Sequence, residues 1–372
     1  MRRMLVCALA VSLLLVSSGC PRKKTAPAEL SYIPSDAAVV TVVRVKKIME
    51  AKLLEPLLQD AMIAGQLKQS PIDPRIIESL TVAGLPRKGA TKPGQPPFSP
   101  VMVVNFTEPT DGKAIIEKSA PRGQAKFEER SHQGKSYYAF ARDAFCFQPD
   151  EKTFVVAEGE ETLKGLLSGV PKGPAAEKLD AAGADNDIVA VVLMEPLRGS
   201  MKDASQQLKN APMPGMAELA TLPDQLKSAT LTVNLSSETL AKVVLECTSA
   251  ESAQKVNDGL KKGLDLAKLL IGFATAAPKP SDNVPPEAKE ALNVAIRLLD
   301  GIKLTQSGEQ VIITAAKPEG LEKLVASIPE LMRKSMSAGP GLKRPTRGGK
   351  TSAPAFKPPT KEEPAKPEPP SK

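Results

Sequence analysis

The folded body opens with a β-branched run, Ala37-Ala38-Val39-Val40-Thr41-Val42-Val43-Arg44-Val45. Because valine and threonine favour extended backbone, this run predicts a strand. Its almost continuous apolar character predicts that the strand is buried on both faces or lies at the centre of a sheet. A second run of the same kind recurs in the later half of the chain, Asp187-Ile188-Val189-Ala190-Val191-Val192-Leu193-Met194.

Each run begins a series of alternating elements. After the first run, apolar spacing and turn residues predict helices over residues 53–62, 71–80, 111–119 and 160–167, and strands over residues 101–106, 126–130, 135–141, 145–148 and 153–157. After the second run they predict helices over residues 197–209, 216–226, 285–299 and 318–336, strands over residues 229–235 and 240–247, and a hairpin over residues 302–315. Thr248 and Glu251 have the spacing of a capping box at the start of one more helix.

Together the two series predict an α+β fold of two similar modules, residues 35–183 and residues 184–338. Each module is expected to hold a mixed or antiparallel sheet packed by helices. The later parts of the modules also match, because residues 148–167 resemble residues 306–324 with small gaps. Any chain of alternating strands and helices shows some similarity between its segments, so chance similarity is the alternative to duplication.

The start of the chain has the layout of a secretory signal peptide. Arg2-Arg3 precedes an apolar run from Met4 to Val16, and small residues then lead to Cys20. A helix that spans a bilayer needs about 20 apolar residues, and this run is shorter. We therefore expect the apolar run to be removed.

The residues Ser17-Ser18-Gly19-Cys20 resemble the lipobox of bacterial lipoproteins, although Ser17 stands where that family usually carries a larger apolar residue. The resemblance implies that residues 1–19 are cut off, that the thiol of Cys20 carries diacylglycerol, and that residues 20–34 form a tether. The alternative is an ordinary secreted protein cut near Ala26 or Ala28. The body also resembles uncharacterised envelope lipoproteins that repeat such modules behind a lipobox, and that resemblance implies no activity.

The net charge of +8 lies at the ends of the chain, because residues 1–24 hold basic residues and no acid, and residues 339–372 hold more basic residues than acids. A nucleic-acid-binding protein would carry its basic residues and aromatic rings on the folded part. The chain has no Trp and 3 Tyr, which also argues against stacked rings for sugars. The Pro- and Lys-rich tail, residues 339–372, is expected to be disordered, either as a solvated end or as a cationic arm for anionic envelope polymers.

Four cysteines are present. Cys7 is expected to be removed with the leader, and Cys20 is the expected lipid site. An oxidising compartment would permit the other two, Cys146 and Cys247, to form a disulfide. Both lie in apolar runs, which favours two separate buried thiols, and this is our preferred interpretation.

The sequence predicts no catalytic, cofactor or metal site. The one histidine, His132, lies in an expected turn, and the cysteines lack the spacing of a zinc site. Two groups of acids could be drawn as paired carboxylates, namely Glu128 and Glu129 with Asp143, and Glu158 with Glu160 and Glu161. Charged strand faces and acids in the first turn of a helix are the simpler interpretation.

These features predict a lipid-anchored protein of the bacterial cell envelope that faces the periplasm or the cell surface. Its body is expected to act as a non-catalytic binding or scaffolding module, with the membrane as one partner and an envelope protein or an anionic polymer as another, and without nucleic acid. The alternative is a hydrolase of envelope material whose carboxylates the sequence does not identify.

Overall fold

The computed structural model describes residues 28–70, 72–87, 98–119, 127–141, 143–169, 172–199, 201, 206, 220–276 and 286–337. The chain divides into two compact units, residues 1–331 and residues 332–372, and the fold below is that of the first. The leader, Cys20 and the tail from residue 339 lie outside the described residues. The packed body starts before residue 35, because Leu30 and Ile33 of the expected tether are only 4% and 1% exposed.

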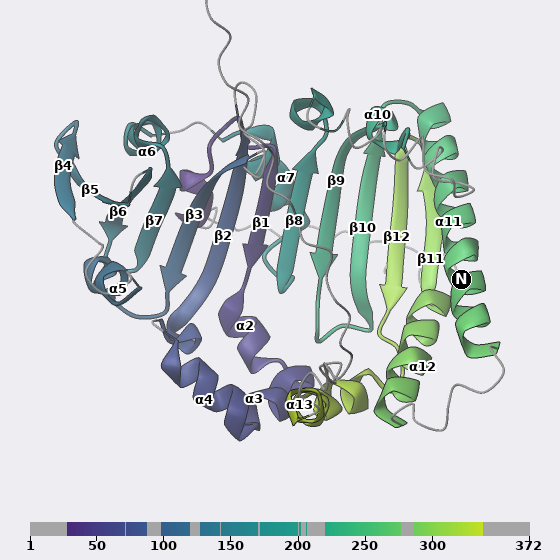
Figure 1. Cartoon of the computed structure of the whole chain (residues 1–372). Helices are drawn as coiled ribbons and strands as arrows, with labels where there is room; N and C mark the ends of the chain where they lie inside the picture. The colour runs from purple at the N-terminus through teal and green to yellow at the C-terminus, as the bar shows by residue number, and fades with distance from the viewer. Residues whose placement is uncertain are drawn as a thin grey trace, which may run out of the picture. The chain divides into compact units, whose positions relative to one another are not determined.

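A single antiparallel sheet of 12 strands forms the body (Figure 1). Its strands along the chain are β1 (Val39–Val43), β2 (Ile77–Pro86), β3 (Phe98–Phe106), β4 (Glu128–His132), β5 (Lys135–Ala141), β6 (Ala144–Asp150), β7 (Thr153–Glu158), β8 (Ile188–Leu193), β9 (Leu226–Val233), β10 (Thr239–Cys247), β11 (Ile302–Ser307) and β12 (Gln310–Ala316). The sheet and its helices confirm the α+β class.

The helices of the first half are η1 (Ala28–Tyr32), α2 (Val45–Glu50), η2 (Lys52–Leu54), α3 (Glu55–Gln59), α4 (Ala61–Gln69), η3 (Pro74–Ile76), α5 (Gly112–Ser119), α6 (Glu160–Leu167) and α7 (Pro174–Ala182). The helices of the second half are η4 (Glu195–Leu197), α10 (Leu222–Gln225), α11 (Ala250–Ala276), α12 (Pro286–Asp300) and α13 (Leu321–Ser337).

The two β-branched runs that open the expected modules pair with each other. β1 lies antiparallel to β8, with Val39 opposite Val192 and Val43 opposite Ile188. On the N-terminal side of this pair the strands follow the order β1-β2-β3-β7-β6-β5-β4, and on the C-terminal side the order β8-β9-β10-β12-β11. The strands of residues 35–183 and of residues 184–338 therefore share one sheet, joined at its centre.

Both faces of the sheet carry buried clusters. Val40, Val103 and Val191 pack with α6 and α7 in the largest cluster, which we call the α6–α7 cluster. Neighbouring residues in a strand point to opposite faces, so Val104 and Val192 lie on the other face. There Val104 belongs to a cluster with α5, the α5 cluster, and Val192 packs against a cluster with α11, the α11 cluster.

Several expected elements differ from those observed. Residues 71–80 were expected to form a short helix, but only η3 is helical and β2 begins at Ile77, where buried and exposed residues alternate. The expected helix over residues 53–62 is divided, because the carboxylate of Asp60 accepts hydrogen bonds from the N–H groups of Met62 and Ile63 and starts α4.

Three more differences concern helices. α7 was not expected, because the Pro- and Gly-rich stretch before it predicted a break, although proline fits the first turn of a helix. The cap of α11 is Ser249 and not Thr248, since the hydroxyl of Ser249 accepts from the N–H of Ser252 at 3.0 Å. Of the helices expected over residues 197–209 and 216–226, η4 and α10 are described and most of the rest lies outside the described residues.

Among the described residues, no helix combines the length and apolar character that crossing a bilayer requires.

Candidate functional site

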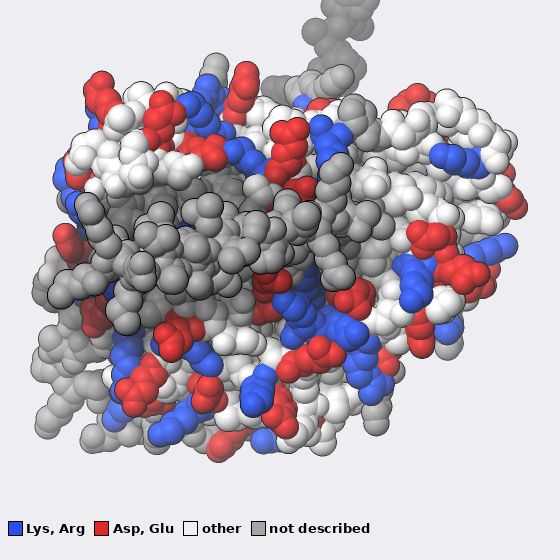
Figure 2. Space-filling model, turned by 180° about the vertical axis from the view of Figure 1, so that it is seen from behind, with Lys and Arg blue, Asp and Glu red and all other residues white. Residues whose placement is uncertain are grey.

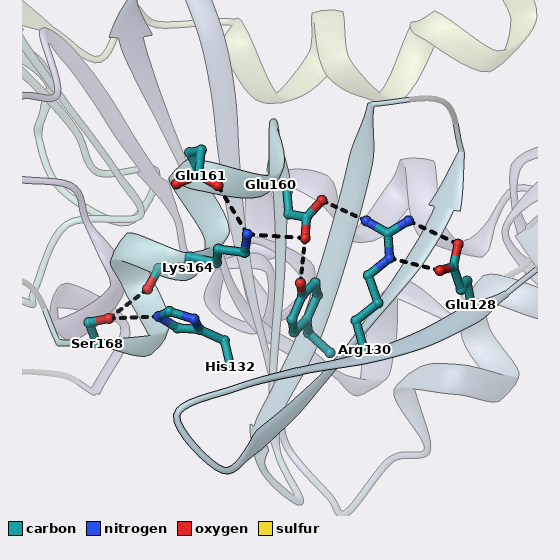
Figure 3. A network of polar contacts seen from close by, with 8 residues as sticks. Glu128, Arg130, His132, Glu160, Glu161, Lys164 and Ser168 are labelled. Atoms are coloured by element: carbon teal, nitrogen blue, oxygen red, sulfur yellow. Dashed lines mark hydrogen bonds and ion pairs between the residues drawn. The ribbon is translucent and has the colours of Figure 1, made fainter.

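Three of the six carboxylates singled out in the sequence, Glu128, Glu160 and Glu161, gather around the first turn of α6, where β4 and β5 lie beside the helix (Figure 3). Among the described residues, the side chains of Glu129 and Asp143 form no ion pair with this network. Glu160 accepts a hydrogen bond from the hydroxyl of Tyr137 at 2.5 Å and forms an ion pair with Arg130 at 2.6 Å. Lys164, one turn further along α6, lies 3.3 Å from the same carboxylate. Two cations therefore offset the charge of Glu160, and the phenol of Tyr137 donates a hydrogen bond to it.

Glu128 is held in the same network. The guanidinium of Arg130 donates to both carboxylate oxygens of Glu128, at 3.1 and 2.9 Å, and also lies 5.8 Å from the centre of the Phe145 ring. Such bidentate pairs fix both the distance and the orientation of the two groups. Glu161 is paired with Lys164 at 3.0 Å, and Glu158, at the end of β7, is paired with Arg87 at 2.5 Å.

The charges in this network favour ionised carboxylates. The hydrogen bond from Tyr137 is the main cause that lowers the pKa of Glu160, and the hydrogen bond from Arg130 lowers the pKa of Glu128. The same bond to Glu160 raises the pKa of Tyr137 and keeps its phenol neutral. A general acid needs a raised pKa, so this arrangement is the opposite of what proton donation at neutral pH requires.

His132 and Lys135 attach the β4–β5 hairpin to the end of α6. The Nε2 atom of His132 lies 3.3 Å from the Ser168 hydroxyl, which donates to the carbonyl of Lys164 at 2.9 Å. Lys135 donates to the carbonyl of Leu167 at 2.6 Å. Leu167 is the last residue of α6, where the negative end of the helix dipole stabilises a cation. His132 is the last residue of β4, so the expected turn consists of the two residues after it.

The two internal cysteines are free thiols that lie in different clusters. Cys146 of β6 is buried in the α5 cluster, and burial raises the pKa of its thiol to about 12. Cys247 of β10 is buried in the α11 cluster, and burial likewise raises its pKa. A raised pKa keeps a thiol protonated and slow to react. Within the described ranges, no group of His, Cys, Asp and Glu is arranged to hold a metal ion.

A pocket of about 570 Å³ lies where β5, β6 and β7 meet η1, α5 and α6, and we call it the β5–β7 pocket. Four of its lining residues are aromatic, namely Tyr32, Tyr138, Phe147 and Phe154, and the ring of Tyr32 meets that of Phe147 edge to face with 5.7 Å between centres. Burial raises the pKa of Tyr32, and the charge of Asp150 adds to this effect. Because the lining residues come from six elements, no local motif in the sequence indicates this pocket.

Polar groups stand beside the rings in the pocket. Lys113, Lys135 and Asp111 contribute charged groups, and Gln148 accepts from the N–H of Gly112 at 2.9 Å while it donates to the carbonyl of Thr110 at 2.8 Å. Ligand pockets usually combine an apolar wall with a few placed polar groups in this way. The β5–β7 pocket is therefore our candidate binding site.

Comparison with known proteins gives a distant likeness in structure. No protein-family model and no curated protein matches this chain. Three crystal forms of TP0453 (III, I and IV) each align with 80% of this chain and with 97%, 96% and 95% of their own, at 12% identity and TM-scores of 0.39, 0.37 and 0.40. At scores this low we draw nothing about the function of this chain from the alignment.

Proposed function

We propose that this chain is an exported, lipid-anchored protein of the bacterial cell envelope, facing the periplasm or the cell surface. The leader and the resemblance of residues 17–20 to a lipobox support this placement. The thiol of Cys20 is the expected lipid site. Stable anchoring takes more than one acyl chain, which a diacylglycerol supplies, and Arg22, Lys23 and Lys24 would add attraction to anionic lipid head groups.

We propose further that the folded body binds or holds partners and does not catalyse a reaction. The observation that favours binding is the state of the acids beside α6. Glu160, Glu128 and Glu158 are each paired with a cation, and none of these pairs leaves a carboxylate in an apolar setting that would make it an acid catalyst. The β5–β7 pocket offers a site for the bound molecule.

The body is proposed to be a duplication of one module, residues 35–183 and residues 184–338. The strand order on the two sides of the β1–β8 pair supports this view. Counted outward from the pair, the order begins β1-β2-β3-β7-β6 on one side and is β8-β9-β10-β12-β11 on the other. On each side the first three strands are in chain order, the last strand of that half comes next, and the strand before it in the chain follows. On both sides a helix, α6 or α13, follows that last strand.

The proposed partners are the membrane, through Cys20, and an envelope protein or anionic polymer. Residues 339–372 would supply a cationic arm for the polymer. On the face seen in Figure 2, basic and acidic side chains of the described residues are intermingled. A nucleic-acid partner is not proposed, since it would require a continuous basic area.

The placement is tested by labelling a bacterial host with a radioactive fatty acid and then separating membranes from soluble protein. The native chain should incorporate label and sediment with the membranes. Cys20→Ala should lose the label and become soluble, because no other residue of the leader junction offers a thiol. Cys7→Ala is the matched control, since it also removes a leader cysteine but leaves the lipid site.

Two results would contradict the proposal. Labelling of the Cys20→Ala protein would show that lipid is attached elsewhere. A native protein that is unlabelled and soluble in the cytosol with Met1 still present would refute both the export and the anchor.

A further inference from the structure

The β5–β7 pocket carries two cations without acidic partners. The ammonium group of Lys113 lies 5.6 Å from the centre of the Tyr138 ring, and that of Lys135 donates to the carbonyl of Leu167. Among the residues that the structure describes, neither group takes part in an ion pair. An ammonium group has three N–H donors, so both lysines retain donors for a ligand.

The one carboxylate among the described lining residues does not offset these charges fully. An oxygen of Asp111 accepts from the backbone N–H groups of Lys113 and Ala114 at 2.9 and 3.2 Å, which makes Asp111 the cap of α5. The positive end of the helix dipole already compensates part of its charge. The pocket therefore favours an anion.

The wall beside these cations is aromatic and closely fitted. Phe154 is 5% exposed, and its ring packs against the backbone of Gly112. A Cβ atom at Gly112 would come within 2.5 Å of the Phe154 ring, so only glycine permits this approach. Tyr138 lies on the same face of the sheet as Phe154, whereas the Tyr32–Phe147 pair lies on the α6–α7 face, so rings from both faces line the pocket and can contact a flat apolar group.

The volume limits the size of the ligand. At about 570 Å³ the pocket falls in the range of roughly 300–1,000 Å³ that small-molecule sites occupy. We propose that the β5–β7 pocket binds a small organic anion with a flat, apolar body and one carboxylate, which the charges of Lys113 and Lys135 attract. This inference rests on the proposed binding role and gives that role a site and a ligand class.

The test compares 1-naphthoate with 1-naphthamide, which has the same rings but no charge. The chain has no Trp, so the fluorescence of the naphthalene group can be followed in the full-length protein with little background. We expect naphthoate to bind at least roughly tenfold more tightly, which is the contribution of one hydrogen bond to a charged group. Equal binding of the two probes, or binding of neither, would overturn the proposal.

Variants assign the binding to the pocket. Lys113→Gln, and to a lesser degree Lys135→Gln, should reduce the affinity for naphthoate toward that for naphthamide. Lys303→Gln, on the exposed side of β11, is the matched control and should change neither affinity. Gly112→Ala should displace the ring of Phe154 and lower the affinity for both probes by the same factor. Circular dichroism checks that every variant is folded, and unchanged naphthoate binding in a folded Lys113→Gln, Lys135→Gln double variant would refute the site.

A third probe tests the shape of the ligand. Decanoate carries the same charge on a flexible chain, and we expect it to bind more weakly than naphthoate. Tighter binding of decanoate would assign the pocket to acyl chains and overturn the flat-ligand inference. None of these outcomes affects the labelling of Cys20, so this inference and the proposed anchor can fail separately.

Discussion

The N-terminal and C-terminal sides of the sheet share an order of strands but differ in their packing. On the N-terminal side both faces are buried, by the α6–α7 cluster and the α5 cluster, and β7 is almost fully covered. On the C-terminal side the α11 cluster covers one face and the α6–α7 cluster covers the other face at β8, but β9, β11 and β12 are mostly half-buried or exposed.

Side-chain size accounts for this difference. Every Tyr and all Phe except Phe273 and Phe356 precede residue 159, so the described rings lie on the N-terminal side. The α11 cluster consists of Leu, Val, Ala, Met and Cys side chains, with Ile313 among those packed against it, and its described residues include no aromatic ring. Since aromatic rings bury more area than aliphatic chains, the same strand order gives a larger core on one side. Topology therefore does not determine how stability is distributed along this sheet.

The largest effect is expected for leucine truncation in the two cores. Leu163 of α6 is 0% exposed in the α6–α7 cluster, and Leu245 of β10 is 9% exposed in the α11 cluster. Leu163→Ala should lower the free energy of unfolding by about 2–5 kcal/mol, and Leu245→Ala by an amount at or below the low end of that range. Urea denaturation followed by circular dichroism measures both. A larger loss for Leu245→Ala would contradict the comparison.

The next effect concerns the packing of α7 on the centre of the sheet. Gly173 precedes α7, and a Cβ atom there would come within 2.2 Å of the backbone oxygen of Ser35. The backbone of Ser35 cannot rotate away from an added methyl group as a side chain could. Gly173→Ala should therefore lower the free energy of unfolding by about 1–3 kcal/mol. Gly165→Ala is the control, since Gly165 lies within α6 with open space around it, and it should raise stability by up to about 1 kcal/mol. Equal thermal stability of the two variants would refute the close contact.

The reactivity of the two free thiols measures the unfolding of the N-terminal and C-terminal sides of the sheet separately. Cys146 lies on the N-terminal side and Cys247 on the C-terminal side, and both are buried with raised pKa values. Neither should react with iodoacetamide at neutral pH in the native protein. As urea is increased, Cys247 should be modified at a lower concentration than Cys146, which mass spectrometry of the separate peptides can measure. Simultaneous modification would mean that the two sides unfold together.

The smallest effect is an alkaline loss of stability specific to the N-terminal side. The bond to Glu160 raises the pKa of Tyr137 above its ordinary value of 10.0. A raised pKa in the folded state contributes stability that is fully present below pH 10 and is lost as the pH rises through the folded value. Tyr137→Phe should remove this pH dependence, measured as the unfolding free energy between pH 9 and 11. An unchanged profile in the variant would assign the loss to other groups.

Local patterns predicted the α+β class and the two central strands, because Val39–Val43 and Ile188–Leu193 are continuous β-branched runs. β2 was missed because Pro71 and Pro74 resemble the start of a helix, while Glu78 interrupts the apolar spacing. The pairing of β1 with β8 and the bond between Tyr137 and Glu160 join residues far apart in sequence, and no local pattern encodes such contacts. The β5–β7 pocket could not be predicted for the same reason.

The pairing of β1 with β8 also has a consequence for attempts to produce either half alone. Cutting the chain between them would leave each fragment with a valine-rich strand whose N–H and C=O groups on one edge lack partners. Exposed edges of this kind recruit strands from other molecules, so the fragments should aggregate or form dimers when expressed separately. Each half thus protects the other from self-association.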